Sequence, residues 1–237
     1  MGEWLVELRG HVFDLRDLAD LFTTPDLLVV QEGEEFRLKS TAFDALASED
    51  DVYAKAKALM PSLNGIASVY VTGYRNVGMS GGIISIDAGG TRKRYIYEAV
   101  TEEIRLKASV DVAGGVAVAR GPTEADAAIK AALNKEKEVV SRALQFFSLE
   151  KNWVNLYKVL DAIKEDMGSA DPVTKKGWVS ASEIDRFTGT ANNHNAAKGN
   201  ARHGYVSKRP MKKKPMTLAE AEQLIRTLLT QWLKSTK

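Results

Sequence analysis

The side chains best suited to bind or cleave a polyanion are concentrated in one segment, Arg186–Met216, here called the basic segment. It holds eight Lys or Arg residues, no Asp or Glu, and two of the three histidines of the chain. A neutral histidine accepts a proton near neutral pH, and an arginine can hold a phosphate through two hydrogen bonds. These residue types indicate phosphate binding, or metal-independent RNA cleavage through the ribose 2′-hydroxyl.

The candidate residues fall into two groups. The candidate catalytic residues are His194, Arg202 and His203. The candidate nucleic-acid-binding residues are Lys198, Lys208, Arg209, Lys212, Lys213 and Lys214. Pro210 and Pro215 prevent a helix across Lys208–Lys214, so we expect this part of the basic segment to be an extended, solvent-exposed strap that binds phosphate groups. The competing interpretation is a solvated loop without a ligand.

A second motif, Gly78–Gly82, matches the G-x-S-x-G pattern around a nucleophilic serine, here Ser80. That motif must lie between a strand and a helix, but a strand-like sequence follows it. The glycines also lack the Gly-Lys-Ser/Thr ending of a phosphate-binding loop. We therefore favour a glycine-rich connection between strands over serine hydrolysis.

Acidic and aromatic clusters have structural interpretations that outweigh functional ones. Glu49–Asp51 and Glu102-Glu103 lack a third ligand at metal-binding spacing, so we expect neither a metal nor a cofactor. Tyr95 and Tyr97 follow three basic residues and could stack on bases, but alternating aromatics are more typical of a half-buried strand.

The first half of the chain is rich in predicted strands. Helices are predicted from an N-cap at Asp14 to Phe22, and from a capping box at Ser48 to Asn64-Gly65. A change of parity in the last strand predicts a β-bulge near Thr101–Glu103. The predicted strands are Glu3–Arg9, Leu27–Gln31, Glu35–Lys39, Ile66–Thr72, Ile83–Ala88 and Arg92–Val112.

The second half has helical periodicity. One helix from Thr123 to about Phe147 would be about 35–40 Å long. Further helices are predicted at Asn152–Met167, from Ser180 to about Phe187, and from Thr217 onward. Their single apolar stripes predict a bundle. The expected fold class is α+β: an N-terminal mixed α/β part with an antiparallel sheet (1–120), followed by a C-terminal helical bundle (121–237).

Composition narrows the classes of function. The 237 residues include no cysteine, which excludes thiolate nucleophiles and disulfides. No apolar run approaches the roughly 18 residues of a membrane-spanning helix, and the N-terminus does not resemble a signal peptide. We expect a cytoplasmic protein without a membrane partner. The net charge of +2 combines the cationic basic segment with an acidic remainder.

The helical half resembles HEPN domains, which are helical bundles found in many prokaryotic RNases and RNA-associated defence proteins. The resemblance rests on the four predicted helices and on Arg and His residues before the last one. HEPN domains place a histidine four to six residues after an arginine. Seven residues separate Arg186 from His194, and none separate Arg202 from His203, so neither pair has that spacing. The resemblance implies RNase activity.

From the sequence we therefore expect an intracellular protein that binds an anionic partner, most simply RNA, through the basic segment. Metal-independent RNase activity is the further expectation. DNA is an alternative ligand. The alternative function is a non-catalytic protein–protein interaction module.

Overall fold

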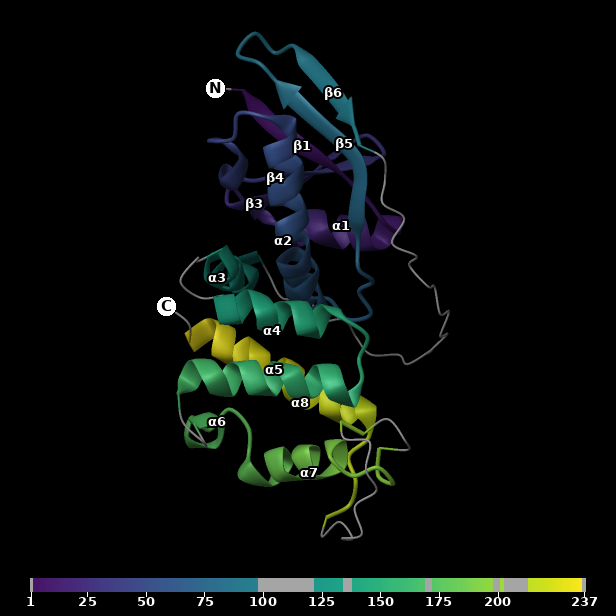
Figure 1. The fold of residues 1–237 in the computed structure, drawn as a ribbon, viewed down its shortest axis with the longest axis vertical. Helices are drawn as coiled ribbons and strands as arrows, with labels where there is room; N and C mark the ends of the chain where they lie inside the picture. The colour runs from purple at the N-terminus through teal and green to yellow at the C-terminus, as the bar shows by residue number, and fades with distance from the viewer. Residues whose placement is uncertain are drawn as a thin grey trace. The chain divides into compact units, whose positions relative to one another are not determined.

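The computed structural model describes residues 2–97, 122–133, 138–168, 172–197, 201–202 and 213–235. The chain divides into two compact units, Met1–Met60 with Tyr70–Asp126, and Pro61–Val69 with Ala127–Lys237. The first contains a six-stranded antiparallel sheet and the second is helical, which confirms the α+β class (Figure 1). The predicted boundary residue Gly121, the predicted bulge and the extended run beyond Tyr97 lie outside the described residues.

The first unit is built around its sheet, in which the strands follow the order β2-β3-β4-β1-β5-β6. Strand β1 and the β3–β4 hairpin form where the sequence predicted them, whereas β5 begins five residues earlier than predicted. The elements are β1 (Glu3–Arg9), α1 (Val12–Leu21), β2 (Thr23–Thr24), β3 (Leu27–Glu32), β4 (Glu35–Lys39), the 3-10 helix η1 (Thr41–Phe43), α2 (Glu49–Tyr70), β5 (Gly78–Ile86) and β6 (Arg92–Ile96).

One face of the sheet packs against α2. Ile83 of β5 pairs with both Val6 of β1 and Tyr95 of β6, so these three side chains share a face. Tyr97, two residues after Tyr95, stacks on Tyr53 of α2 with the ring centroids 4.4 Å apart. Residues at the alternate positions therefore lie on the opposite face, which carries the charged side chains described below.

Helix α1 is capped by a different residue from the one predicted. Nδ1 of His11 accepts the backbone N–H of Phe13, whereas the predicted cap Asp14 lies in the first turn. The Asp14 side chain is buried and accepts hydrogen bonds from the backbone N–H and Nε of Arg75, at 3.1 and 2.9 Å. Its carboxylate therefore anchors a distant loop instead of capping the helix.

Helix α2 does not end at Asn64-Gly65, and the predicted strand Ile66–Thr72 is wrong because the helix continues to Tyr70. A Cβ atom at Gly65 would lie 2.5 Å from the carbonyl oxygen of Leu144 in α4. The glycine thus permits a close approach of α4, which explains its presence inside a helix. Residues 61–69 of α2 belong to the second unit.

The second unit contains α3 (Pro122–Leu133), α4 (Glu138–Ser148), α5 (Trp153–Met167), α6 (Pro172–Lys175), α7 (Ala181–Ala191) and α8 (Leu218–Ser235), with α3 beginning in the first unit. The caps predicted at Ser180 and Thr217 are confirmed, and Asn152, predicted as the start of a helix, is the N-cap of α5. Helix α5 packs against α4, α6, α7 and α8 (Figure 1). No described helix is long and apolar enough to cross a bilayer.

The single helix predicted from Thr123 to Phe147 is wrong. The hydroxyl of Ser141 in α4 donates to the carbonyl oxygen of Ala132 in α3, at 3.0 Å. Residues nine apart in one straight helix would be separated by about 13 Å along the axis. The chain therefore forms two helices that pack on each other, and small residues of α3, such as Ala128, are buried there.

Candidate functional site

The two ends of the basic segment are folded into the helical unit. Helix α7 runs to Ala191, four residues beyond the predicted end. The buried hydroxyl of Thr190 donates to the carbonyl oxygen of Arg186 and accepts the backbone N–H of Met216, each close to 2.8–2.9 Å. The basic segment is therefore not exposed along its whole length, because apolar residues such as Phe187 join the helical core.

Arg186 is held firmly by the start of α8. Its guanidinium lies 2.9 Å from both carboxylate oxygens of Glu220 and also donates to the carbonyl oxygens of Lys214 and Pro215. The backbone N–H of Thr217 and the hydrogen bond from Arg186 lower the pKa of Glu220 to about 2. Arg186 therefore joins the first residue of the basic segment to its last residues and to α8, which is a structural role.

Arg202 is placed differently, with its guanidinium over an aromatic ring. The guanidinium carbon is 4.0 Å from the ring centroid of Tyr157, and one nitrogen lies 3.4 Å from the carboxylate of Asp161. The side chains of Arg202 and Asp161 are 36% and 49% exposed. The backbone N–H of Arg202 donates to the carbonyl oxygen of Ala191 at 2.8 Å, which attaches this residue to the end of α7.

Lys213 and Lys214 lie just before α8, and both are exposed. The Lys213 ammonium group is 3.3 Å from a carboxylate oxygen of Asp185 and 3.3 Å from the hydroxyl of Ser182. The side chain of Lys214 makes no hydrogen bond or ion pair within the described parts of the chain. Both cations are therefore accessible to a ligand from solvent.

His194 lies in the turn that follows α7. The side chain of Asn193 accepts the backbone N–H of Ala196 at 3.0 Å and so shapes this turn. The Nδ1 atom of His194 is buried and has no hydrogen-bond partner among the described residues. The other predicted site residues, His203, Lys198, Lys208, Arg209 and Lys212, lie outside the described residues.

The structure thus brings Arg202 together with Tyr157 and Asp161, two residues of α5 that the sequence analysis did not select. The spacing of Tyr157 and Asp161 could have identified them as a pair, because residues four apart lie on the same face of a helix. Tyr157 also stacks on Phe187 of α7, with the ring centroids 5.8 Å apart. The chemistry available here is the binding of an anion by a guanidinium that is already oriented.

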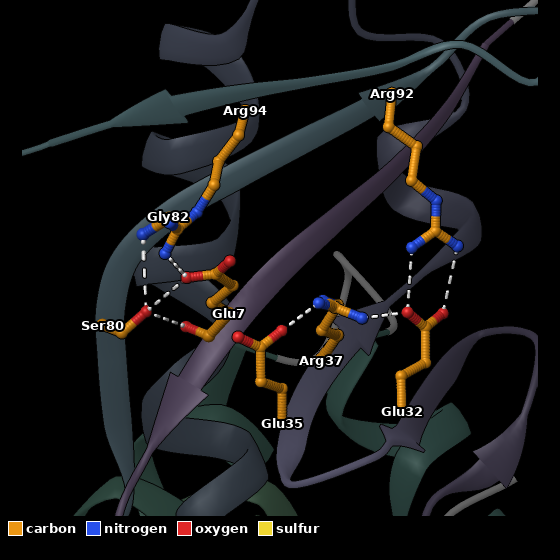
Figure 2. Close-up of polar contacts among 8 residues, drawn as sticks. All are labelled: Glu7, Glu32, Glu35, Arg37, Ser80, Gly82, Arg92 and Arg94. Atoms are coloured by element: carbon orange, nitrogen blue, oxygen red, sulfur yellow. Dashed lines mark hydrogen bonds and ion pairs between the residues drawn. The ribbon is translucent and has the colours of Figure 1, made fainter.

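Ser80, the serine of the G-x-S-x-G motif, lies within β5. It contacts a buried carboxylate on the charged face of the sheet, opposite to the face that packs against α2 (Figure 2). Its hydroxyl lies 3.2 Å from Oε2 of Glu7, which also accepts a hydrogen bond from Arg94 at 2.7 Å. A Cβ atom at Gly82 would overlap the carboxylate of Glu7. These small residues make room for Glu7, but they lie inside β5 and not in the connection between strands that the sequence predicted.

The same face carries a second group of charges, centred on the buried side chain of Arg37 (Figure 2). Its guanidinium contacts the carboxylate of Glu32 in β3 and that of Glu35 in its own strand, β4. Arg92 of β6 reaches the same Glu32 with two nitrogens, at 3.0 and 3.3 Å. Positive and negative side chains alternate and neutralise one another, so this face does not resemble an anion-binding surface.

The tyrosines of the first unit pack within the molecule. The hydroxyl of Tyr97 donates to the carboxylate of Asp50 at 2.6 Å, and this bond raises the pKa of Tyr97 to about 12. Tyr95 lies against Trp4, with the ring centroids 6.2 Å apart. Asp50 thus makes a tertiary contact with Tyr97, and Asp51 forms the helix cap with Ser48. Both tyrosines already contact aromatic rings of the protein itself.

One further ionisable group, Lys151, is perturbed without belonging to the basic segment. Its ammonium group lies over the ring of Phe147, at 4.5 Å, and donates to the carbonyl oxygens of Phe147 and Leu149. Burial lowers the pKa of Lys151 to about 8, an effect that Glu222 opposes and Arg226 strengthens. The contacts are those of a lysine that caps the end of α4.

Comparisons with protein-family models, with curated proteins and with solved structures gave no match to this chain.

Proposed function

We propose that the helical unit binds a nucleic acid, with RNA as the expected ligand, through the basic segment. The observation that carries the proposal is the exposure of Arg202, Lys213 and Lys214 on a segment without acidic residues. Cations concentrated in one segment of a chain can bind phosphates and release the counterions of the nucleic acid.

The carboxylates that contact these cations do not remove them from a ligand's reach. The Arg202–Asp161 and Lys213–Asp185 pairs are 3.4 and 3.3 Å long and partly exposed. Exposed pairs contribute about 0–1 kcal/mol each. A nucleic acid that offers several phosphates at once can therefore replace both carboxylates. Arg186, by contrast, is committed to Glu220 and to two carbonyl oxygens.

The proposal is tested by fluorescence anisotropy with labelled single-stranded RNA, and with duplex DNA for comparison. Replacing Lys213 and Lys214 together by alanine should weaken binding to all RNA sequences alike, because these lysines contact phosphates and not base edges. A matched control replaces Lys175 and Lys176, two exposed lysines outside the basic segment, by alanine. Equal loss in both double variants would contradict the assignment of the site.

RNase activity is a separate prediction. It requires a histidine and an arginine near the same phosphate, and only His194 and Arg202 of the three candidate residues are described. Incubation of labelled RNA with the protein in EDTA should yield cleavage products that disappear in the variant His194→Ala. Absence of cleavage by the wild type, with binding intact, would restrict the function to binding.

A further inference from the structure

The cations of the basic segment differ in how completely the protein itself satisfies them. The guanidinium of Arg186 has contacts to both Glu220 oxygens and to two carbonyl oxygens. Within the described residues, the guanidinium of Arg202 has one polar contact, the 3.4 Å approach to the carboxylate of Asp161. A guanidinium carries five N–H donors, so most donors of Arg202 have no acceptor among the described residues.

Arg202 is nevertheless held in a defined orientation. Its guanidinium lies on Tyr157, whose ring stacks on the fully buried Phe187, at an interplanar angle of 27°. Its backbone N–H is bound to the end of α7 through Ala191. A guanidinium that lies over an aromatic ring keeps its N–H groups at its edges, where a ligand can accept hydrogen bonds from them. Ordering this side chain in a complex therefore costs little, since the free protein already orders it.

We propose that the guanidinium of Arg202 receives a phosphate group of the ligand, and that the carboxylate of Asp161 occupies this position in the free protein. The inference rests on the function proposed above and deepens it. A phosphate offers two oxygens to one edge of a guanidinium, whereas Asp161 makes one long contact. Asp161 therefore acts as a weak internal competitor, whose contact with Arg202 must break before a phosphate can bind there.

This arrangement predicts that removing the carboxylate partner of Arg202 strengthens the binding of RNA, whereas the loss of a polar contact at a binding site usually weakens it. In the variant Asp161→Asn the competitor and its negative charge are gone, while Tyr157 still supports Arg202. We expect the dissociation constant for single-stranded RNA to fall about two- to fivefold, because breaking an exposed ion pair of this kind costs up to about 1 kcal/mol. The variant Arg202→Lys should bind more weakly than the wild type, because a lysine cannot form the paired hydrogen bonds.

The control for net charge is Glu150→Gln. Glu150 is exposed, and its side chain makes no hydrogen bond or ion pair in the described parts of the chain. This change adds the same charge without touching Arg202, so we expect less than a twofold effect. The double variant Asp161→Asn/Arg202→Gln should bind no better than Arg202→Gln alone, because the gain depends on Arg202.

The experiment measures anisotropy of a labelled single-stranded RNA with these variants, after circular dichroism has shown the same helical content in each. Tighter binding by Asp161→Asn, lost in the double variant, supports the inference. Equal binding by Asp161→Asn and Glu150→Gln, with the wild type still binding, overturns the inference but leaves the proposed function standing. No binding by the wild type or any variant overturns both.

Discussion

Arg92 and Glu32 form an ion pair although β4, β1 and β5 separate their strands in the sheet. Two guanidinium nitrogens of Arg92 lie 3.0 and 3.3 Å from the two oxygens of Glu32. Figure 2 shows the two long side chains reaching toward each other over the charged face of the sheet. The hydrogen bond from Arg92 is the main reason that the pKa of Glu32 lies below its usual value.

Replacing Arg92 by glutamine should change stability little at neutral pH, because both partners are well exposed. A lowered carboxyl pKa contributes stability that is present above the ordinary value near 4.5 and is lost as the pH falls. The Arg92→Gln variant should therefore lose less stability than the wild type on acidification below about pH 4.5. Urea midpoints at pH 7 and pH 3 provide the measurement, and a large loss at pH 7 would contradict it.

Gly82→Ala should destabilise the first unit by about 1–3 kcal/mol, the usual cost of forcing an atom into a packed site. The new Cβ would displace the buried carboxylate of Glu7 from Ser80 and Arg94. Gly78→Ala is the matched control in the same strand, because its Cβ would meet only the Arg9 side chain, at 3.4 Å. Urea denaturation compares the two, and equal losses would refute the role of Gly82.

Glu220 links the start of α8 to the basic segment, and its effect should depend on pH. Since the pKa of Glu220 is lowered to about 2, its stabilising contribution is complete above pH 4.5. It decreases as the pH falls from about 4.5 toward 2. The variant Glu220→Gln should show a smaller change of the urea midpoint with pH in this window than the variant Glu150→Gln. Identical profiles for the two variants would contradict this.

Lys151 should titrate near pH 8, because burial lowers its pKa to about 8. A lysine whose folded pKa is lowered makes the protein more stable as the pH rises from about 8 toward its ordinary value of about 10.5. Side-chain NMR of ¹³Cε-labelled lysines should show one signal with a midpoint near 8 that is absent in Lys151→Met. A spectrum in which no lysine signal titrates below pH 9.5 would contradict this.

Local sequence signals predicted many of the elements. Strand β1, the β3–β4 hairpin and the caps at Ser180 and Thr217 all depend on residues close together in the chain. The errors arose where a tertiary contact decided the outcome. Gly65 resembles a helix terminator, but it makes room for Leu144, about 80 residues away in the chain, and the helix continues.

The candidate site was predictable only in part. Charge density identified the basic segment, but its ends are buried because Phe187 and Met216 join the helical core. Asp161 lies far from Arg202 in the sequence, and no local pattern links them. The i, i+4 spacing of Tyr157 and Asp161 places both on one side of α5, but which arginine lies there depends on how α7 packs on α5.

The measurement that tests the central claim most directly is the salt dependence of RNA binding by the whole chain. The dissociation constant should rise steeply between 50 and 200 mM KCl, with a logarithmic slope of about 0.7 for each phosphate contacted. Replacing Lys213 and Lys214 by alanine should lower that slope by about 1 to 2. Binding that is insensitive to salt, or no binding to RNA or DNA at 50 mM KCl, would contradict the account and leave a protein-interaction role.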